Sequence, residues 1–525
     1  MDFAQNAVAY SQRLDVLKTT SERPDKSRDV IPLSILLTVA LCVGLYLIVT
    51  TAIIAKDGVT FIEYAQRLDT APVKTMVDEF QHPGYPWLIL IAHKAAFSLR
   101  ENPSLLSWIY CGQAVALIFR VLALTALFFI GKRLFGERVS FWGVLILILL
   151  PDPAEYGSDA LSDWPHLFFL LAGVLFLFEG AAGKRWWLFG FASLAGGMGY
   201  LIRPECAQLI VLGMLWLGVQ FLWRKSEMSR GKIVYASILM LLGFLAVAGP
   251  YMKLKGAVFP KKNVGQFSRN ALQREIHAEN RHMARSVMFI SHIPSSKVAK
   301  AFGKLVTNVG ETLMWFFLPA MLIGMGTWFK KNRGFRPESF FITALIVLNL
   351  PVMVWLYCRH GYMSDRHTLP LLIIPILYVP AGLQDLARWL QQRFPIGEKP
   401  SAQIARKEPL WFFVLLLMGV SICIPKLLRP IRAEKQGYRS AATWLKANTN
   451  REDIIAVPDK RIHYYAEREG WVYDNGNIPA HVAYIVTLSK KENNETVFTK
   501  PFGEAEYTYI DKTGRGKNVT IYKNL

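Results

Sequence analysis

The chain has 525 residues, of which 52% are hydrophobic and only 19% are charged. This composition, with long uncharged runs recurring along the chain, excludes an ordinary soluble protein and indicates a polytopic membrane protein. The formal net charge of +21 lies mostly in loops beside these runs, and no aromatic-basic module typical of nucleic-acid binding accompanies it.

Residues 1–30 are polar and basic, and no small-residue cleavage site follows a short apolar core. They are therefore predicted to be a cytoplasmic tail before a retained first helix. The apolar run over 31–55 is long enough to cross about 30 Å of hydrocarbon.

The next two apolar stretches, 85–99 and 105–130, cannot both cross the membrane. If they did, the basic segment 132–138 would lie outside and every later loop would be inverted against the positive-inside tendency. The shorter stretch is therefore predicted to be an interfacial helix on the outer face.

This assignment predicts about eleven spans, with the Lys/Arg-rich loops inside and the C-terminus outside. The predicted spans are 31–55, 105–130, 140–151, 163–181, 187–201, 206–223, 233–252, 309–329, 338–357, 367–384 and 410–428. They form a transmembrane domain over 31–430, which includes a first outer loop (56–104) and a long basic outer loop (253–308).

Residues 431–525 are predicted to form a small extracytoplasmic α/β domain. A helical pattern covers 438–447, and short strand patterns cover 453–457, 483–488, 507–510 and 519–522. This region has no nucleotide-binding loop or nucleophile motif, so a structural or acceptor-positioning role is favoured over an independent enzyme.

The first outer loop is acidic, and carboxylates beside hydrocarbon are costly unless they are hydrated, paired or used. Asp57 lies where the first span meets this loop; a simpler interpretation is a helix N-cap. The loop ends in the turn His82-Pro83-Gly84-Tyr85-Pro86, in which His82 and Tyr85 are candidate substrate contacts. Two prolines and a glycine also suit any sharp return into the bilayer.

In the second outer loop, Asp159 and Asp163 are four residues apart. On a helix they would share a face, where two close carboxylates repel and raise one pKa. That arrangement suits acid/base chemistry or cation binding. The alternative is a solvated turn in which Asp163 caps the following helix.

Basic residues also reach the outer boundary. Arg203 lies between two apolar runs, where it pairs with Glu205 or an acidic loop, or contacts an anionic substrate. Arg359, Arg366 and His367 precede the tenth span and are candidate phosphate ligands.

The loop over 253–308 contains eleven Lys or Arg residues, which indicates anionic lipid head groups or a lipid phosphate nearby. No strong metal motif is visible, so metal ligands stay unassigned. No cofactor is firmly implied, and assistance by a divalent cation is left open.

Six motifs follow one another within residues 31–380: DGVTFIEYAQ, HPGYP, KRLFG, SDALSD, LIRPE and DRHTLP. In this order they resemble the GT-C glycosyltransferases of the protein O-mannosyltransferase and aminoarabinose transferase type (glycosyltransferase family 39). The resemblance implies a multi-span core with its active site on the outer face and a polyprenyl-phosphate sugar as donor.

By this resemblance, Asp57 matches the general base or acceptor-orienting residue, and the second-loop acids correspond to the region of Asp159 and Asp163. Arg203 and Arg366 match positions near the donor phosphate. The chain departs from the pattern at Gly58, where the family often has Glu, and at Gly84, where it often has Pro.

We therefore predict a membrane glycosyltransferase of the cell envelope, in the bacterial inner membrane, that moves a hexosyl or pentosyl group to a lipid, glycan or protein acceptor. The alternative is a transporter or flippase of a lipid-linked or anionic solute. Clustering of carboxylates at the outer boundary, without an internal repeat, favours the enzyme. A third possibility is a non-catalytic relative that acts as a membrane scaffold.

Overall fold

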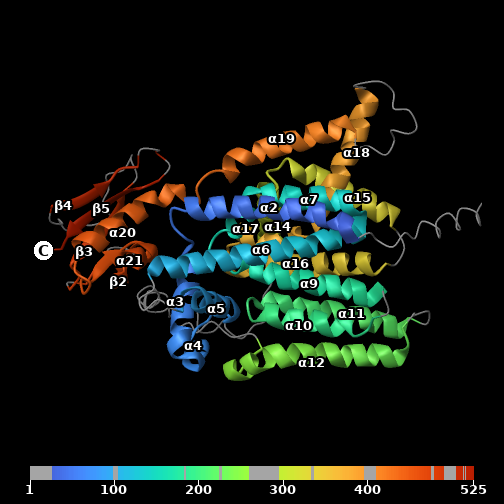
Figure 1. The fold of residues 1–525 in the computed structure, drawn as a ribbon, viewed down its shortest axis with the longest axis horizontal. Coiled ribbons are helices and arrows are strands. Elements are labelled where there is room, and N and C mark those ends of the chain that lie inside the picture. Colours follow the sequence, from blue (N-terminus) through green and yellow to red (C-terminus); the bar gives the residue numbers. More distant parts are fainter. Residues whose placement is uncertain are drawn as a thin grey trace, which may run out of the picture.

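A computed structural model shows a helical bundle with a smaller sheet domain at one end (Figure 1). It describes residues 26–98, 104–182, 185–223, 228–258, 295–332, 336–394, 409–473, 478–479, 481–489, 504–511, 514 and 516–524. Most of the predicted N-terminal tail and of the predicted basic loop lies outside the described residues.

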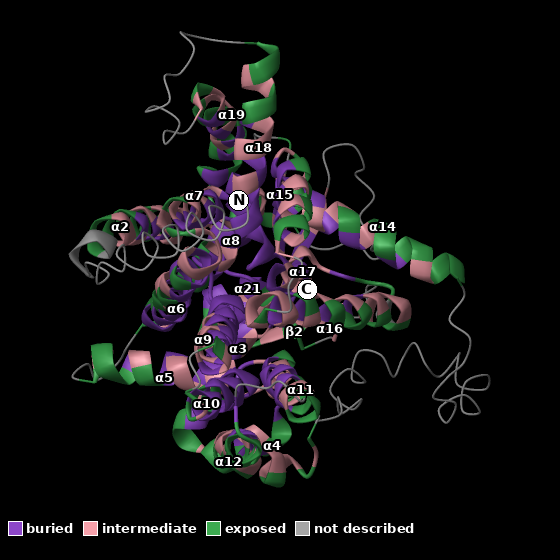
Figure 2. Cartoon of the chain, turned by 90° about the vertical axis from the view of Figure 1, so that its right-hand side faces the viewer, coloured by how far each residue is buried: buried purple, intermediate pink, exposed green. Residues whose placement is uncertain are grey.

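The bundle consists of long apolar helices and two short 3₁₀ turns. These are α2 (Lys26–Thr50), α6 (Leu105–Phe135), α7 (Glu137–Leu149), α9 (Asp163–Ala182), α10 (Leu188–Tyr200), η1 (Pro204–Ala207), α11 (Gln208–Leu222), α12 (Arg230–Lys255), α14 (Ser295–Thr312), α15 (Phe317–Lys331), α16 (Pro337–His360), α17 (Asp365–Leu372), η4 (Pro375–Leu377), α18 (Tyr378–Arg393) and α19 (Leu410–Leu427). Buried side chains concentrate around α6, α9 and α10, whereas α12 and α14 are largely exposed at the periphery (Figure 2).

Within the described ranges, seven helices are long and apolar enough to cross a membrane, or nine if two bent helix pairs each count as one span. The polytopic fold is therefore confirmed, and the predicted number of eleven is approximate. The difference lies in α7 and α10, which have 13 residues each and are shorter than the roughly 20 residues that a full crossing needs.

Two predicted continuous spans are bent. The predicted span 309–329 falls on α14 and α15, which meet at 105°, and the predicted span 367–384 falls on α17 and α18, which meet at 59°. At the first break Met314 and Trp315 have φ angles of 53° and 56°, which ends a right-handed helix.

Three short helices lie at the bundle end that carries the sheet domain (Figure 1): α3 (Lys56–Thr70), α4 (Pro72–Asp78) and α5 (Gly84–Phe97). Another short helix, α8 (Pro151–Tyr156), precedes α9. Helix α5 has 14 residues, too few to cross a bilayer, and it packs against α3 and α6. Its place at the membrane interface stays a prediction.

The sheet domain contains five strands in the order β2-β1-β3-β5-β4. Its elements are η6 (Ala433–Lys435), α20 (Gln436–Asn448), β1 (Ile455–Val457), α21 (Lys460–Ala466), β2 (Gly470–Val472), β3 (Tyr484–Ser489), β4 (Ala505–Tyr509) and β5 (Asn518–Lys523). Strand β1 is parallel to β2 and β3, and β5 is antiparallel to β3 and β4. The small C-terminal α/β domain is thus confirmed.

The sheet domain and the adjacent end of the bundle share one apolar core. Ile54 and Ile62, at the start of the first loop, belong to the same buried cluster as Leu445, Ile462 and Tyr465 of the sheet domain. Burial of this shared surface holds the domain against α3, and the carboxylates discussed below lie beside this contact.

Candidate active site

Asp57 lies in the first turn of α3, at the bundle end next to the sheet domain. The helix begins at Lys56, and its N-cap position, Ala55, has no side-chain capping bond. Asp57 therefore does not occupy the cap position that the simpler interpretation gave it. A carboxylate in a first turn is stabilised by the positive end of the helix dipole.

Arg366, at the start of α17, connects Asp57 to Asp163. Its Nη2 donates to Asp57 Oδ2 at 2.5 Å, and its Nη1 lies 3.8 Å from Asp163 Oδ2. The Asp57 side chain is 48% exposed, whereas Asp163 is 2% exposed. Asp57 is thus the member of this group that faces open space.

The charges around Asp57 keep it ionised. Partial burial by itself raises the pKa of this carboxyl, but the charge and hydrogen bond of Arg366, with the charges of Arg203 and Lys460, hold its pKa below the ordinary value. An opposite charge within about 4–6 Å has this effect because it favours the charged form.

Arg203 completes the group on the other side of Asp163. Its Nη2 lies 2.9 Å from Asp163 Oδ1, and its Nε donates to Ser162 Oγ at 3.1 Å. Of the interpretations open for Arg203, the structure thus shows pairing with the acidic second loop. Asp57, Arg366, Asp163 and Arg203 form a row of alternating charges, named here the charge row.

Asp159 does not lie on the helix that begins at Asp163. It occupies a bend between α8 and α9, so the expected shared helical face is absent for these two acids. Its side chain is fully buried. Its oxygens accept from Ala55 N at 3.2 and 3.1 Å, from Ala160 N at 2.8 Å and from Arg432 Nη1 at 2.5 Å.

The two glycines that depart from the family pattern lie where backbones approach closely. A Cβ on Gly58 would be 2.8 Å from the Ala160 carbonyl oxygen, and a Cβ on Gly84 would be 2.6 Å from the Leu201 carbonyl oxygen. The Gly84 N–H also donates to that oxygen at 2.6 Å. Larger residues would separate these segments.

Gly84 thereby fixes the His82–Pro86 turn against the segment that leads to Arg203. Tyr85 is fully buried and donates through its hydroxyl to Gly112 O at 2.9 Å. The His82 ring packs edge-on against Tyr200, with centroids 5.0 Å apart. Burial lowers the pKa of His82 to about 4 against an opposing backbone hydrogen bond with Tyr200, so the ring is neutral at pH 7.

The other three predicted substrate contacts are not members of the charge row. His367 accepts from Ser364 N at 3.1 Å through Nδ1, as part of a capping box at the start of α17. Glu205 is exposed on η1. Arg359 is exposed, and its guanidinium lies 5.2 Å from the centre of the Trp355 ring.

A cavity of about 460 Å³ lies beside the segment that leads to Arg203. Its walls are mainly apolar side chains of α5, α10 and α12, and they include Gly84 and Ile202. Because Ile202 directly precedes Arg203, one end of this cavity is close to the charge row.

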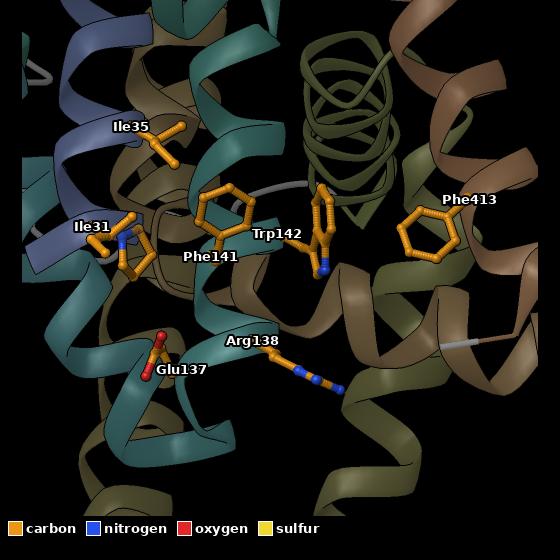
Figure 3. A pocket seen from close by; sticks show the side chains of 8 residues that line it. Ile31, Ile35, Glu137, Arg138, Phe141, Trp142 and Phe413 are labelled. Atoms are coloured by element: carbon orange, nitrogen blue, oxygen red, sulfur yellow. The ribbon is translucent and has the colours of Figure 1, made fainter. Parts of the chain in front are cut away.

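A second cavity of about 540 Å³ lies among α2, α7 and α19 (Figure 3). The rings of Phe141, Trp142 and Phe413 line it in sequence, with neighbouring centroids 5.0 and 5.9 Å apart. Its walls include Arg138 of α7 and no member of the charge row.

Three residues of the C-terminal region approach the acids and escaped prediction. Arg432 binds Asp159, Lys460 donates to Thr60 Oγ1, and Tyr465 Oη accepts from Ile54 N at 3.1 Å. In the sequence Arg432 resembles any basic flank of a membrane span, and no local signal marks the other two. Among the residues that the structure describes, no group of three His, Cys, Asp or Glu could hold a metal ion.

Comparison with known proteins supports the resemblance. A family model described as dolichyl-phosphate-mannose-protein mannosyltransferase matches residues 81–249. This range includes His82, Asp159, Asp163 and Arg203 but neither Asp57 nor Arg366. A comparison with curated protein sequences finds no match.

Solved structures show the same fold. ArnT from Cupriavidus metallidurans in the apo state is 13% identical, with a TM-score of 0.54 over 94% of this chain and 97% of that chain. The same protein bound to undecaprenyl phosphate gives a TM-score of 0.53 at 13% identity, over 93% and 97% of the two chains.

The archaeal oligosaccharyltransferase AglB from Archaeoglobus fulgidus, in complex with an inhibitory peptide and a dolichol-phosphate, is 13% identical. Its TM-score is 0.52, over 88% of this chain and 70% of that chain. This chain thus has the GT-C fold of an integral membrane protein, and its predicted resemblance to GT-C glycosyltransferases is confirmed.

Proposed function

We propose that this protein is a membrane glycosyltransferase that moves a sugar from a polyprenyl-phosphate donor to an acceptor on the extracytoplasmic face of a bacterial inner membrane. The charge row carries this proposal, because it sets a half-exposed carboxylate beside two guanidinium groups at one end of a GT-C bundle. The structural relatives bound to dolichol-phosphate and undecaprenyl phosphate support the donor class.

In this proposal Arg203 and Arg366 bind the donor phosphate. The planar guanidinium presents paired N–H donors that match phosphate oxygens. Asp163, which is almost completely buried, pairs with Arg203 at 2.9 Å and lies 3.8 Å from Arg366, so both guanidinium groups are already close together before the phosphate binds. They stabilise the negative charge that the phosphate gains as it leaves.

Asp57 is the proposed base. The acceptor oxygen or nitrogen attacks the anomeric carbon, the bond from that carbon to the phosphate oxygen breaks, and the phosphate leaves with the electron pair. The acceptor proton passes to Asp57. A single displacement of this kind inverts the anomeric carbon.

The pair between Asp57 and Arg366 couples donor binding to basicity. While Arg366 holds Asp57, the pKa of the carboxyl stays low and the group is a weak base. A donor phosphate that binds Arg366 adds negative charge beside Asp57 and competes for the same guanidinium, so the carboxyl becomes more basic. Asp57 is then strongest as a base when the donor is present.

The cavity of about 460 Å³ suits the isoprenoid chain of the donor. Trp87, Leu88 and Phe169 contribute apolar walls to it, so an isoprenoid chain that leaves the bilayer would exchange contacts with lipid tails for van der Waals contacts with these side chains. Ile202 at its wall would place the lipid beside Arg203, where the phosphate is proposed to bind.

The test is transfer of radiolabelled sugar from a panel of polyprenyl-phosphate sugars in membranes that contain the wild-type chain or an Asp57→Asn variant. Label in a lipid, glycan or protein fraction with the wild type alone would support the transferase and identify the donor and the acceptor class. Absence of label with every donor, in membranes where the protein is folded, would favour a transporter of lipid-linked solutes instead.

A further inference from the structure

Residues 52–54 connect α2 to α3 and lie outside both helices, and the C-terminal region supplies hydrogen bonds to their backbone. Ala52 N donates to Ile431 O at 3.1 Å, and Ile54 N donates to Tyr465 Oη at 3.1 Å. Ile54 O accepts from Arg461 Nη1 at 3.5 Å. Buried backbone groups need such partners, so this connector depends on residues far along the chain.

Arg432, from the same region, contacts three residues at or near this connector. Its Nη1 donates to Asp159 Oδ2 at 2.5 Å and to Ile53 O at 3.5 Å, while its Nη2 lies 3.3 Å from Glu155 Oε1. Its φ angle of 54° is rare for a residue with a side chain. The side chain is 16% exposed.

Asp159 links Arg432 to the start of α3. Both of its oxygens accept from Ala55 N, and Ala55 is two residues before Asp57. Because Asp159 is fully buried, loss of Arg432 would leave a buried carboxylate without its counter-charge. Asp159 would then repack or take up water, and the backbone that it holds would move.

We infer that Arg432 is a positioning residue that, through Asp159, fixes the backbone of residues 52–57 and so sets the place of Asp57 opposite Arg366. The statement about catalysis rests on the proposed function. Arg432 touches no reacting atom. The C-terminal region thereby helps to order the charge row, in addition to any contact that this region makes with the acceptor.

The test uses the full chain with Arg432→Gln and, as a matched control, Arg429→Gln. Arg429 is an exposed arginine of the segment between α19 and η6, which also contains Arg432, and it pairs with Glu434 at 3.5 Å. Two experiments are made: amide hydrogen exchange of peptides covering 52–57, and steady-state kinetics that give kcat and KM for sugar transfer. The control is expected to match the wild type in both.

For Arg432→Gln, exchange over residues 52–57 is expected to accelerate about tenfold or more while α9 keeps its wild-type exchange. The kcat is expected to fall about tenfold to a hundredfold with the KM for the donor within about twofold, because a displacement of about 1 Å has that effect on reactivity. Arg432→Lys keeps the positive charge but loses the paired N–H donors of the guanidinium, so its kcat should lie between those of Arg432→Gln and the wild type.

Unchanged exchange over 52–57 would overturn the inference, and so would accelerated exchange with unchanged kcat. If Arg432→Gln loosens the whole bundle, Arg432→Lys decides, since it keeps a positive charge beside Asp159 but loses the paired guanidinium contacts to Asp159, Ile53 O and Glu155. Accelerated exchange confined to 52–57 then supports the inference, and wild-type exchange overturns it. A wild-type chain that transfers no sugar overturns the proposed function, and the exchange result then still decides whether Arg432 holds this segment.

Discussion

Arg366 Nη2 donates to Asp57 Oδ2 at 2.5 Å across 309 residues of sequence. The pair joins α3 to α17, and it lies next to Asp163 and Arg203. One guanidinium therefore serves two carboxylates, of which only Asp57 is substantially exposed. The first two predictions concern these two residues.

Asp57→Asn should lower sugar transfer about a hundredfold to ten-thousandfold, the usual range for loss of a general base. The amide keeps the shape of the side chain but cannot accept the proton. Asp69→Asn is the control, since Asp69 lies near the C-terminal end of the same helix and pairs with Lys94. Equal transfer by wild type and Asp57→Asn would move the base to a second-loop acid.

Arg366→Lys should raise the KM for the donor about tenfold or more, because lysine keeps the charge but cannot form paired bonds to one phosphate. Steady-state transfer at varied donor concentrations measures this effect. Arg388→Lys is the control; Arg388 is exposed on α18 and pairs with Asp385. A KM that stays at the wild-type value would show that Arg366 does not bind the donor.

Much of the fold could be predicted because hydrocarbon imposes a simple rule on sequence. An apolar run of about 20 residues needs no tertiary information to be assigned as a span, and the short strands of the sheet domain follow from local pattern. The break between α14 and α15 could not be predicted in this way. It depends on positive φ angles at Met314 and Trp315, which no composition marks.

The candidate site was partly visible for the same reason. Asp57, Arg203 and Arg366 stand out because charged residues at the ends of apolar runs are rare. Their partners do not stand out: Arg432 reaches Asp159 across 273 residues. The expected helical pairing of Asp159 with Asp163 was wrong because the second loop bends at Asp159, and spacing alone cannot reveal where a helix starts.

Gly84→Ala should lower the melting temperature of the detergent-solubilised protein, at a cost of about 1–3 kcal/mol, as for other overpacked sites. The added methyl group would lie 2.6 Å from the Leu201 carbonyl oxygen. Gly218→Ala is the matched control, since no atom lies within 4 Å of a Cβ there, and it should be neutral or stabilising. Equal melting temperatures for both variants would contradict this account of the turn.

His82 should make stability depend on pH. Its pKa is about 4 in the folded protein, against 6.5 as its ordinary value, so the unfolded chain takes up a proton first as pH falls. The contribution of the neutral ring is therefore complete above pH 6.5 and is lost between pH 6.5 and about 4. Thermal melting at about pH 7 and about pH 4.5 measures this loss.

The control for this prediction is His82→Gln, which has no titrating ring. Other groups also titrate in this range, so the informative quantity is the difference between the two proteins. The melting temperature of the wild type should fall further than that of the variant on acidification. Parallel curves would show that His82 is not buried in its neutral form.

The contacts from Ile431, Arg461 and Tyr465 to residues 52–54 also set an order of events during synthesis. Residues 52–57 leave the ribosome long before these partners exist, so the nascent chain can insert its spans but cannot order the connector before Asp57. Assembly of the charge row therefore waits until residue 465 has been translated. Under the proposed function, a prematurely terminated chain would reach the membrane without a properly placed Asp57 and would transfer no sugar.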